Sequence, residues 1–139
     1  MDPAATADLA AVFVALYAGH QVADHWIQTQ HQADHKGLPG WVGRWNCAKH
    51  VATYGATQLA ALALVAVVTG LDLSPVPLAA GMAVNLVSHY IADRRAPLRW
   101  LADRLRKNPA WLEKGGGLYA LDQSWHVGFL FLSALIIVA

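Results

Sequence analysis

The chain has 139 residues, enough for one domain, and 56% of them are hydrophobic whereas 14% are charged. Because a soluble domain carries about 25% charged residues, this composition indicates a membrane protein and excludes an intrinsically disordered chain. The single cysteine, Cys47, cannot form an internal disulfide, which excludes a disulfide-stapled secreted scaffold. The formal net charge is +1, so the positions of the charges carry more information than their sum.

Four apolar segments are long enough to cross a membrane as helices, which takes about 20 residues each. In chain order, we predict spans at about residues 9–28, 50–70, 76–93 and 118–139. The connections between them are short enough to place neighbouring helices antiparallel. The sequence therefore predicts an all-α integral membrane protein, with one transmembrane domain over residues 1–139 built as a four-helix bundle. The alternative is a soluble bundle of helices that are apolar all round, which would lack a polar coat.

The basic residues predict how this bundle is oriented. All ten Lys and Arg residues fall in two loops, three in residues 29–49 and seven in residues 94–117. By the positive-inside rule both loops face the cytoplasm and both termini face outward. Tryptophan settles at the level of lipid headgroups, and all six tryptophans lie in or beside these loops: Trp26, Trp41, Trp45, Trp100, Trp111 and Trp125.

The second basic loop also carries a helical pattern. Leu98, Leu101 and Leu105 recur at helical spacing between basic residues. This pattern predicts a short amphipathic helix over Pro97–Lys107, lying on anionic headgroups between the third and fourth spans.

Three of the predicted spans repeat one pair of residue types, a His and an Asp four positions apart. The pairs are His20 with Asp24, His89 with Asp93, and Asp122 with His126, and the second span contributes His50. A spacing of four places both side chains on one helical face. The first two pairs end their spans, whereas His50 and the last pair begin theirs. In an alternating bundle all seven side chains therefore converge at the cytoplasmic end.

Seven ionisable groups at one level of a membrane protein need a shared explanation, since each is costly to bury alone. Asp24 and Asp93 lie at helix C-termini, where the helix dipole disfavours a negative charge and favours a neighbouring cation. Imidazole and carboxylate are ligands of zinc and of non-haem iron or manganese. We predict a divalent metal, zinc first and iron or manganese as alternatives, with candidate ligands His20, Asp24, His50, His89, Asp93, Asp122 and His126. Gln28 and Gln123 are candidates to orient those ligands.

A purely structural interpretation stays open at this point. Each Asp could hold its own His by a hydrogen bond, or pair with Arg94, Arg95 or Arg99, and so fix helix packing alone.

The same residues carry a resemblance that extends over nearly the whole chain. The motifs are His20-Gln-Val-Ala-Asp24 with Gln28, then His50, His89-Tyr-Ile-Ala-Asp93 and Asp122-Gln-Ser-Trp-His126. Together they resemble an uncharacterised bacterial family of small polytopic membrane proteins, a domain of unknown function whose actinobacterial members are often labelled transcriptional regulators. More distantly, the arrangement is similar to the LexA-regulated inner-membrane metal-dependent hydrolases. These resemblances imply a bacterial cytoplasmic membrane protein and favour a metal-dependent hydrolase, but they transfer no substrate.

Three classes of function follow from these observations. The first is a membrane metalloenzyme that hydrolyses a lipid or small amphiphile at the cytoplasmic leaflet, with Asp122 and His126 as candidate catalytic residues. The second is a transporter or channel for protons or a cation, and the third is a non-catalytic scaffold or regulator, in which small-residue faces would suit homo-oligomers. Direct contact with nucleic acid is not expected, because topology already explains every basic residue and no DNA-binding motif is present.

Overall fold

The computed structural model describes residues 3–139, and these residues form helices joined by short connections, with no strand among them. In chain order the helices are α1 (Pro3–Val22), the π-helix η1 (Ala23–Ile27), α2 (Gln30–His35), α3 (Gly40–Thr69), α4 (Pro75–Asp93), α5 (Ala96–Arg104), α6 (Pro109–Lys114) and α7 (Gly117–Ile137). The predicted all-α class is thus confirmed.

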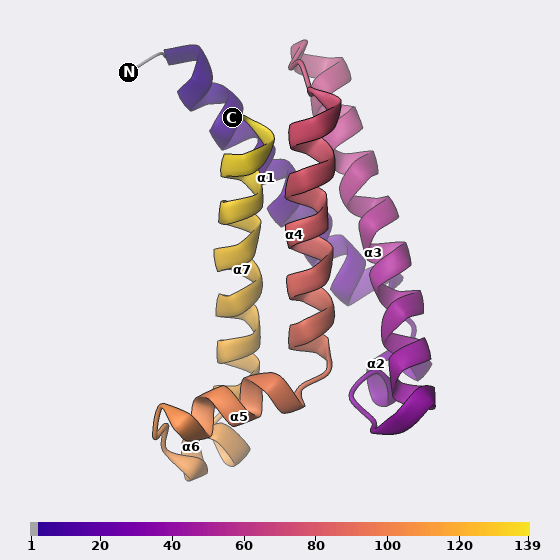
Figure 1. The fold of residues 1–139 in the computed structure, drawn as a ribbon, viewed down its shortest axis with the longest axis vertical. Helices are drawn as coiled ribbons and strands as arrows, with labels where there is room; N and C mark the ends of the chain where they lie inside the picture. Colours follow the sequence, from indigo (N-terminus) through magenta and orange to yellow (C-terminus); the bar gives the residue numbers. More distant parts are fainter. Residues whose placement is uncertain (1–2) are drawn as a thin grey trace.

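Four long helices, α1, α3, α4 and α7, lie side by side and alternate in direction (Figure 1). α4 packs on α7 and α1 packs on α3, while α1 also contacts α7 and α3 contacts α4. The two chain ends lie at one end of the molecule, and α2, α5 and α6 lie at the other (Figure 1). The starts of α3, α4 and α7 therefore alternate between the two ends, and every His and Asp pair falls at the end that carries α5.

Local sequence signals account for where these helices begin and end. Thr29 and Gln32 form a capping box at the start of α2, and the side chain of Asn108 caps α6. Proline occupies the first turn of α4, α5 and α6, where its missing N–H costs no helical hydrogen bond. α3 ends at Gly70, whose φ of 77° is the left-handed conformation that favours glycine.

The half of the molecule nearest the chain ends holds an apolar core. Its buried residues come from all four long helices: Val12, Ala15, Leu16, Leu62, Met82, Leu130, Ala134 and Ile137. Gly81 lets α4 approach α7 closely, because a Cβ there would lie 2.8 Å from the backbone oxygen of Ser133. Most of the buried polar residues lie toward the other end, with Ser133 as an exception.

The outward faces of the long helices are apolar, whereas their buried faces include polar side chains. Val67 and Val76 are 84% and 80% exposed, while His20, His50 and Gln58 are fully buried. Among the described residues, α3 and α7 are long and apolar enough to cross a membrane. α1 and α4, with 20 and 19 residues, are not among these candidates. Four membrane spans therefore stay a prediction.

Several helix boundaries differ from the predicted ones. α3 begins at Gly40, so the second half of the predicted loop 29–49 is helical and continues into the predicted span. The amphipathic helix of the second loop is present as α5, and a further short helix, α6, follows it. The first predicted span is interrupted near its end, where the regular helix α1 gives way to the π-helix η1.

Candidate metal centre

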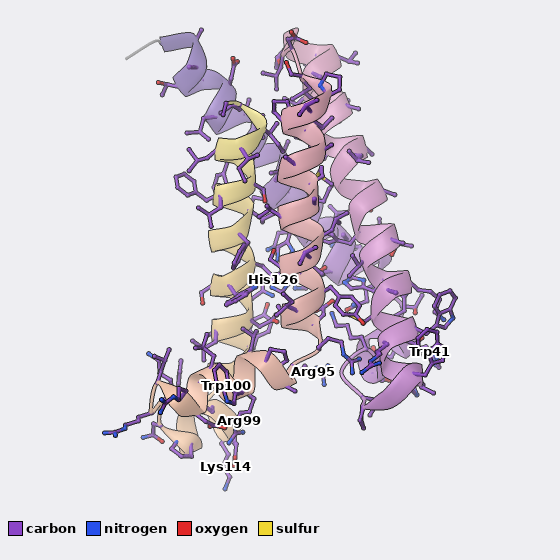
Figure 2. All side chains as sticks on the ribbon, viewed as in Figure 1. Trp41, Arg95, Arg99, Trp100, Lys114 and His126 are labelled. Atoms are coloured by element: carbon purple, nitrogen blue, oxygen red, sulfur yellow. The ribbon has the colours of Figure 1, made fainter. Side chains whose placement is uncertain are left out.

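All seven predicted ligands meet between the long helices, at the end of the molecule that carries α5. His20 ends α1, Asp24 lies in η1, and His50 lies on α3. α4 supplies His89 and Asp93, and α7 supplies Asp122 and His126. Figure 2 shows His126 between α7 and α4, above the level at which α5 crosses the end of the molecule. Every one of the seven belongs to at least one group of side chains close enough to hold a metal ion.

The π-helix places Asp24 in this cluster. The N–H of Gln28 donates to the carbonyl oxygen of Ala23 at 2.9 Å, which closes a turn one residue wider than an α-helical turn. Such turns are rare and frequently occur at functional sites. With this geometry Asp24 contacts its own-helix partner His20 at 3.5 Å and also reaches His50 on α3.

Four atoms from three segments of the chain converge on one point. Nε2 of His50 lies 3.0 Å from Nε2 of His89 and 3.3 Å from Oδ1 of Asp24 and Oδ2 of Asp93. Nε2 of His89 lies 3.5 Å from the same Asp24 oxygen and 3.2 Å from the same Asp93 oxygen. We call these residues, His50, His89, Asp24 and Asp93, the tetrad.

Five of the six distances within the tetrad have the length expected between ligands of a tetrahedral zinc ion. Four atoms at the corners of a regular tetrahedron with an edge of 3.3 Å lie about 2.0 Å from its centre. Bonds from zinc to imidazole nitrogen and carboxylate oxygen are about 2.0–2.2 Å long, so these five distances are compatible with a divalent ion such as zinc.

Hydrogen bonding alone leaves part of the tetrad unsatisfied. Oδ1 of Asp24 and Oδ2 of Asp93 are buried and accept no hydrogen bond, although both imidazoles lie close to them. A neutral imidazole carries one N–H, which cannot serve several converging acceptors at once. A cation at the centre would satisfy all four atoms, whereas the purely structural interpretation leaves two carboxylate oxygens without a partner.

His126 and Asp122 lie beside the tetrad rather than in it. Nδ1 of His126 lies 2.7 Å from the carbonyl oxygen of Asp122 and donates its hydrogen there. Its Nε2 therefore carries the lone pair, and this atom is buried without a hydrogen-bond partner. Together with Asp93, these two residues form a second group that could hold a metal ion.

His20 and the two predicted orienting glutamines differ in their contacts. Nε2 of His20 lies 3.4 Å from Oε1 of Gln123, and Nε2 of Gln123 donates to the carboxylate of Asp122 at 3.3 Å. Gln123 thus contacts two candidate ligands, as an orienting residue would. Gln28 lines the adjoining cavity, but its buried Nε2 makes no hydrogen bond, so the structure does not bring it to a ligand.

Sequence reasoning did not find Lys36. This residue was placed in a polar loop, yet it is buried and its Nζ lies 2.6 Å from Oδ1 of Asp93. The structural interpretation gave Asp93 its own His89 or an arginine as partner. Arg94 and Arg95 instead donate to backbone carbonyl oxygens of the α2 region, those of Lys36, Leu38 and Ala33. The two arginines therefore hold α2 against the end of α4, which sets Lys36 beside the tetrad.

A cavity of about 670 Å³ opens beside the centre. The carboxylates of Asp24, Asp93 and Asp122 line it, and Lys36 and Arg95 face it as cations. Alanines and leucines supply half of the remaining lining residues: Ala33, Ala92, Ala96, Leu98 and Leu118. Pockets that bind small molecules have this size and this combination of apolar wall and few charged groups.

No protein-family model, curated protein or solved structure matches this chain. The resemblances that the motifs suggest therefore stay predictions.

Proposed function

We propose that this chain is a membrane-embedded metal-dependent hydrolase that acts on a lipid or small amphiphile at the cytoplasmic leaflet. One observation carries the proposal, namely that the ligand atoms of two histidines and two aspartates lie 3.0–3.5 Å apart beside a cavity that Asp122 also lines. The metal is zinc in this proposal, held by His50, His89, Asp24 and Asp93, and the four long helices are the four spans of a bundle.

The outer surface of the long helices supports a location of the protein in a membrane. The long helices expose apolar side chains on their outer faces, and buried polar groups lie between the helices, as expected for a protein surrounded by lipid. At the end with the metal centre, Trp26 and Trp41 are 84% and 73% exposed. Figure 2 shows Trp41 and Trp100 on either side of that end, at the level expected for a headgroup layer. All ten basic residues lie toward the same end, which favours the cytoplasmic side.

Because four protein ligands would fill a tetrahedral site, a divalent ion in the tetrad would have to accept a fifth ligand to supply Lewis-acid chemistry to water or to a carbonyl or phosphoryl oxygen, as catalytic zinc sometimes does. The cavity beside the tetrad admits the substrate, and its apolar wall excludes bulk water from one side of the reacting bond. Asp122 lines this cavity with a side chain that is 28% exposed, and it is not needed to complete the tetrad. Its carboxylate would take the proton from the attacking water, while Gln123 holds that carboxylate in place.

The assay that tests this function measures product release from an ester amphiphile and a phosphoester amphiphile by zinc-loaded protein in detergent. Asp122→Asn should retain zinc and lose at least about a hundredfold in rate, since a general base contributes about that much. His50→Gln should lose both zinc and activity. Hydrolysis that is equally fast in both variants and the wild type would contradict the proposal.

Transport is the alternative that the structure supports less. Tyr54, Asn85 and Gln58 extend the buried polar region from the centre toward the middle of the helices, and Tyr54 donates to Asn85 at 2.9 Å. Beyond them Leu16, Leu62 and the rest of the apolar core fill the space between the helices. A route for a proton or cation would have to cross that core.

A further inference from the structure

We propose that the cavity beside the tetrad binds an amphiphile through an anionic, phosphate-like headgroup, and that it does so only when the metal is bound. This inference rests on the proposed function and names the substrate class of the same site. It follows from the charges around the cavity, the position of Arg95 and the composition of the cavity wall.

The balance of charge depends on the metal. Without it, the carboxylates of Asp24, Asp93 and Asp122 face the cations Lys36, Arg95 and Arg99 on the cavity wall. Because Arg99 is paired with carboxylates outside the lining, the three carboxylates outnumber the remaining two cations and an anion would be repelled. A dication in the tetrad cancels the charges of Asp24 and Asp93. Lys36 and Arg95 are then opposed by Asp122 alone, so the wall becomes net positive and attracts an anion.

Arg99 also lines the cavity, but it is engaged elsewhere. It forms ion pairs with Asp103 at 3.0 Å and Glu113 at 3.2 Å. These bonds raise the pKa of its guanidinium above the ordinary value. Because both pairs neutralise it, Arg99 adds little attraction for a ligand, and the anion must be held chiefly by Lys36 and Arg95.

Arg95 is placed at the cavity by a strained backbone. Its φ is 59°, which non-glycine residues adopt rarely, and it starts α5 from this conformation. Gly37 leaves room for its side chain, since a Cβ there would lie 2.8 Å from Cδ of Arg95. Only one of its guanidinium nitrogens, Nη2, is bonded to Ala33, so the planar fork retains donors for a phosphate. Figure 2 shows Arg95 at the end of the molecule, near the start of α5.

The rest of the wall selects a ligand with an apolar part. Leu98 and Leu118 line the cavity together with three alanines. A free phosphate would use the cations but leave this surface in contact with water, whereas an alkyl phosphate would cover it. The same chemistry could therefore come from a lipid headgroup or from inorganic phosphate, and the two should differ in affinity.

The test is a titration of purified protein in dodecyl maltoside micelles with three probes: dodecyl phosphate, dodecyltrimethylammonium and inorganic phosphate. Zinc content is measured first, and each titration is run on zinc-loaded and chelator-stripped protein. We expect dodecyl phosphate to bind the loaded protein at least about tenfold more tightly than either other probe, and to bind the stripped protein about tenfold more weakly. Loaded protein that binds both dodecyl probes equally, or that binds inorganic phosphate as tightly as dodecyl phosphate, would overturn the inference.

Two variants locate the binding. Arg95→Gln should weaken dodecyl phosphate about tenfold without loss of zinc, because it removes a charged hydrogen-bond donor. Arg104→Gln makes the same charge change on the exposed end of α5, outside the cavity, and should leave binding unchanged. Equal effects of the two variants would overturn the inference. Stoichiometric zinc without dodecyl phosphate binding would also overturn the inference, but it would still support the metal centre. A wild type that takes up no zinc would contradict the proposed function itself.

Discussion

At the scale of single residues, the ion pair of Lys36 with Asp93 distinguishes two states of the centre. Both side chains are largely buried, and the removal of one partner from such a pair leaves an uncompensated charge. In the tetrad, Oδ2 of the same carboxylate faces the proposed metal. The carboxylate of Asp93 would therefore be neutralised by both the metal and Lys36.

The substitution Lys36→Met should consequently destabilise the metal-free protein more than the zinc-loaded one. We expect a loss of about 3 kcal/mol without zinc and about 1 kcal/mol with it, because zinc then compensates the carboxylate. Thermal unfolding in detergent with and without zinc measures the difference. Lys49→Met, at an exposed position, is the control and should change neither value. An equal loss in both states would argue against a metal at Asp93.

Among the elements, α4 and α7 pack closely in the apolar half of the molecule. Gly81→Ala would place a Cβ 2.5 Å from Cγ1 of Ile137 and 2.8 Å from the Ser133 backbone oxygen, so the two helices must separate. We expect a cost of about 1–3 kcal/mol, as in other overpacked cores, measured as a lower unfolding temperature. Gly128→Ala on α7 meets nothing within 4 Å and should be neutral or slightly stabilising. A lower unfolding temperature for Gly128→Ala than for Gly81→Ala would show that this contact does not hold the helices together.

The elements also show how far the sequence determines this site. The pairs spaced by four residues were enough to predict that His20, His89 and Asp93 face one end of the helices, because helical periodicity is a local property. The ion pair of Lys36 with Asp93 was not predicted, because its partner is far away in the sequence and nothing in the local pattern marks Lys36 as buried. The π turn at Asp24 was not predicted for a similar reason, since contacts across the helices rather than local propensity decide its position.

At the scale of the whole molecule, the proposal fixes which surfaces face the cytoplasm. The connection between α3 and α4 should face outward, and the segment between α5 and α6 should face inward. Ser74→Cys and Lys107→Cys place a single exposed thiol at each, and the native Cys47 is buried and should not react. In intact cells a membrane-impermeant maleimide should label Ser74→Cys at once and Lys107→Cys only after permeabilisation. Labelling of both positions in intact cells would contradict the four-span arrangement.

The central claim is that His50, His89, Asp24 and Asp93 hold one divalent metal. The most direct measurement is metal content by mass spectrometry of detergent-purified protein, for the wild type, His50→Gln and the exposed control His25→Gln at matched helicity. We expect one zinc per chain in the wild type and in His25→Gln, and its loss in His50→Gln. Cobalt substituted into the same site should give the intense visible absorption of tetrahedral coordination. A folded wild type that holds no metal after reconstitution, or a His50→Gln variant that holds as much as the wild type, would contradict the central claim.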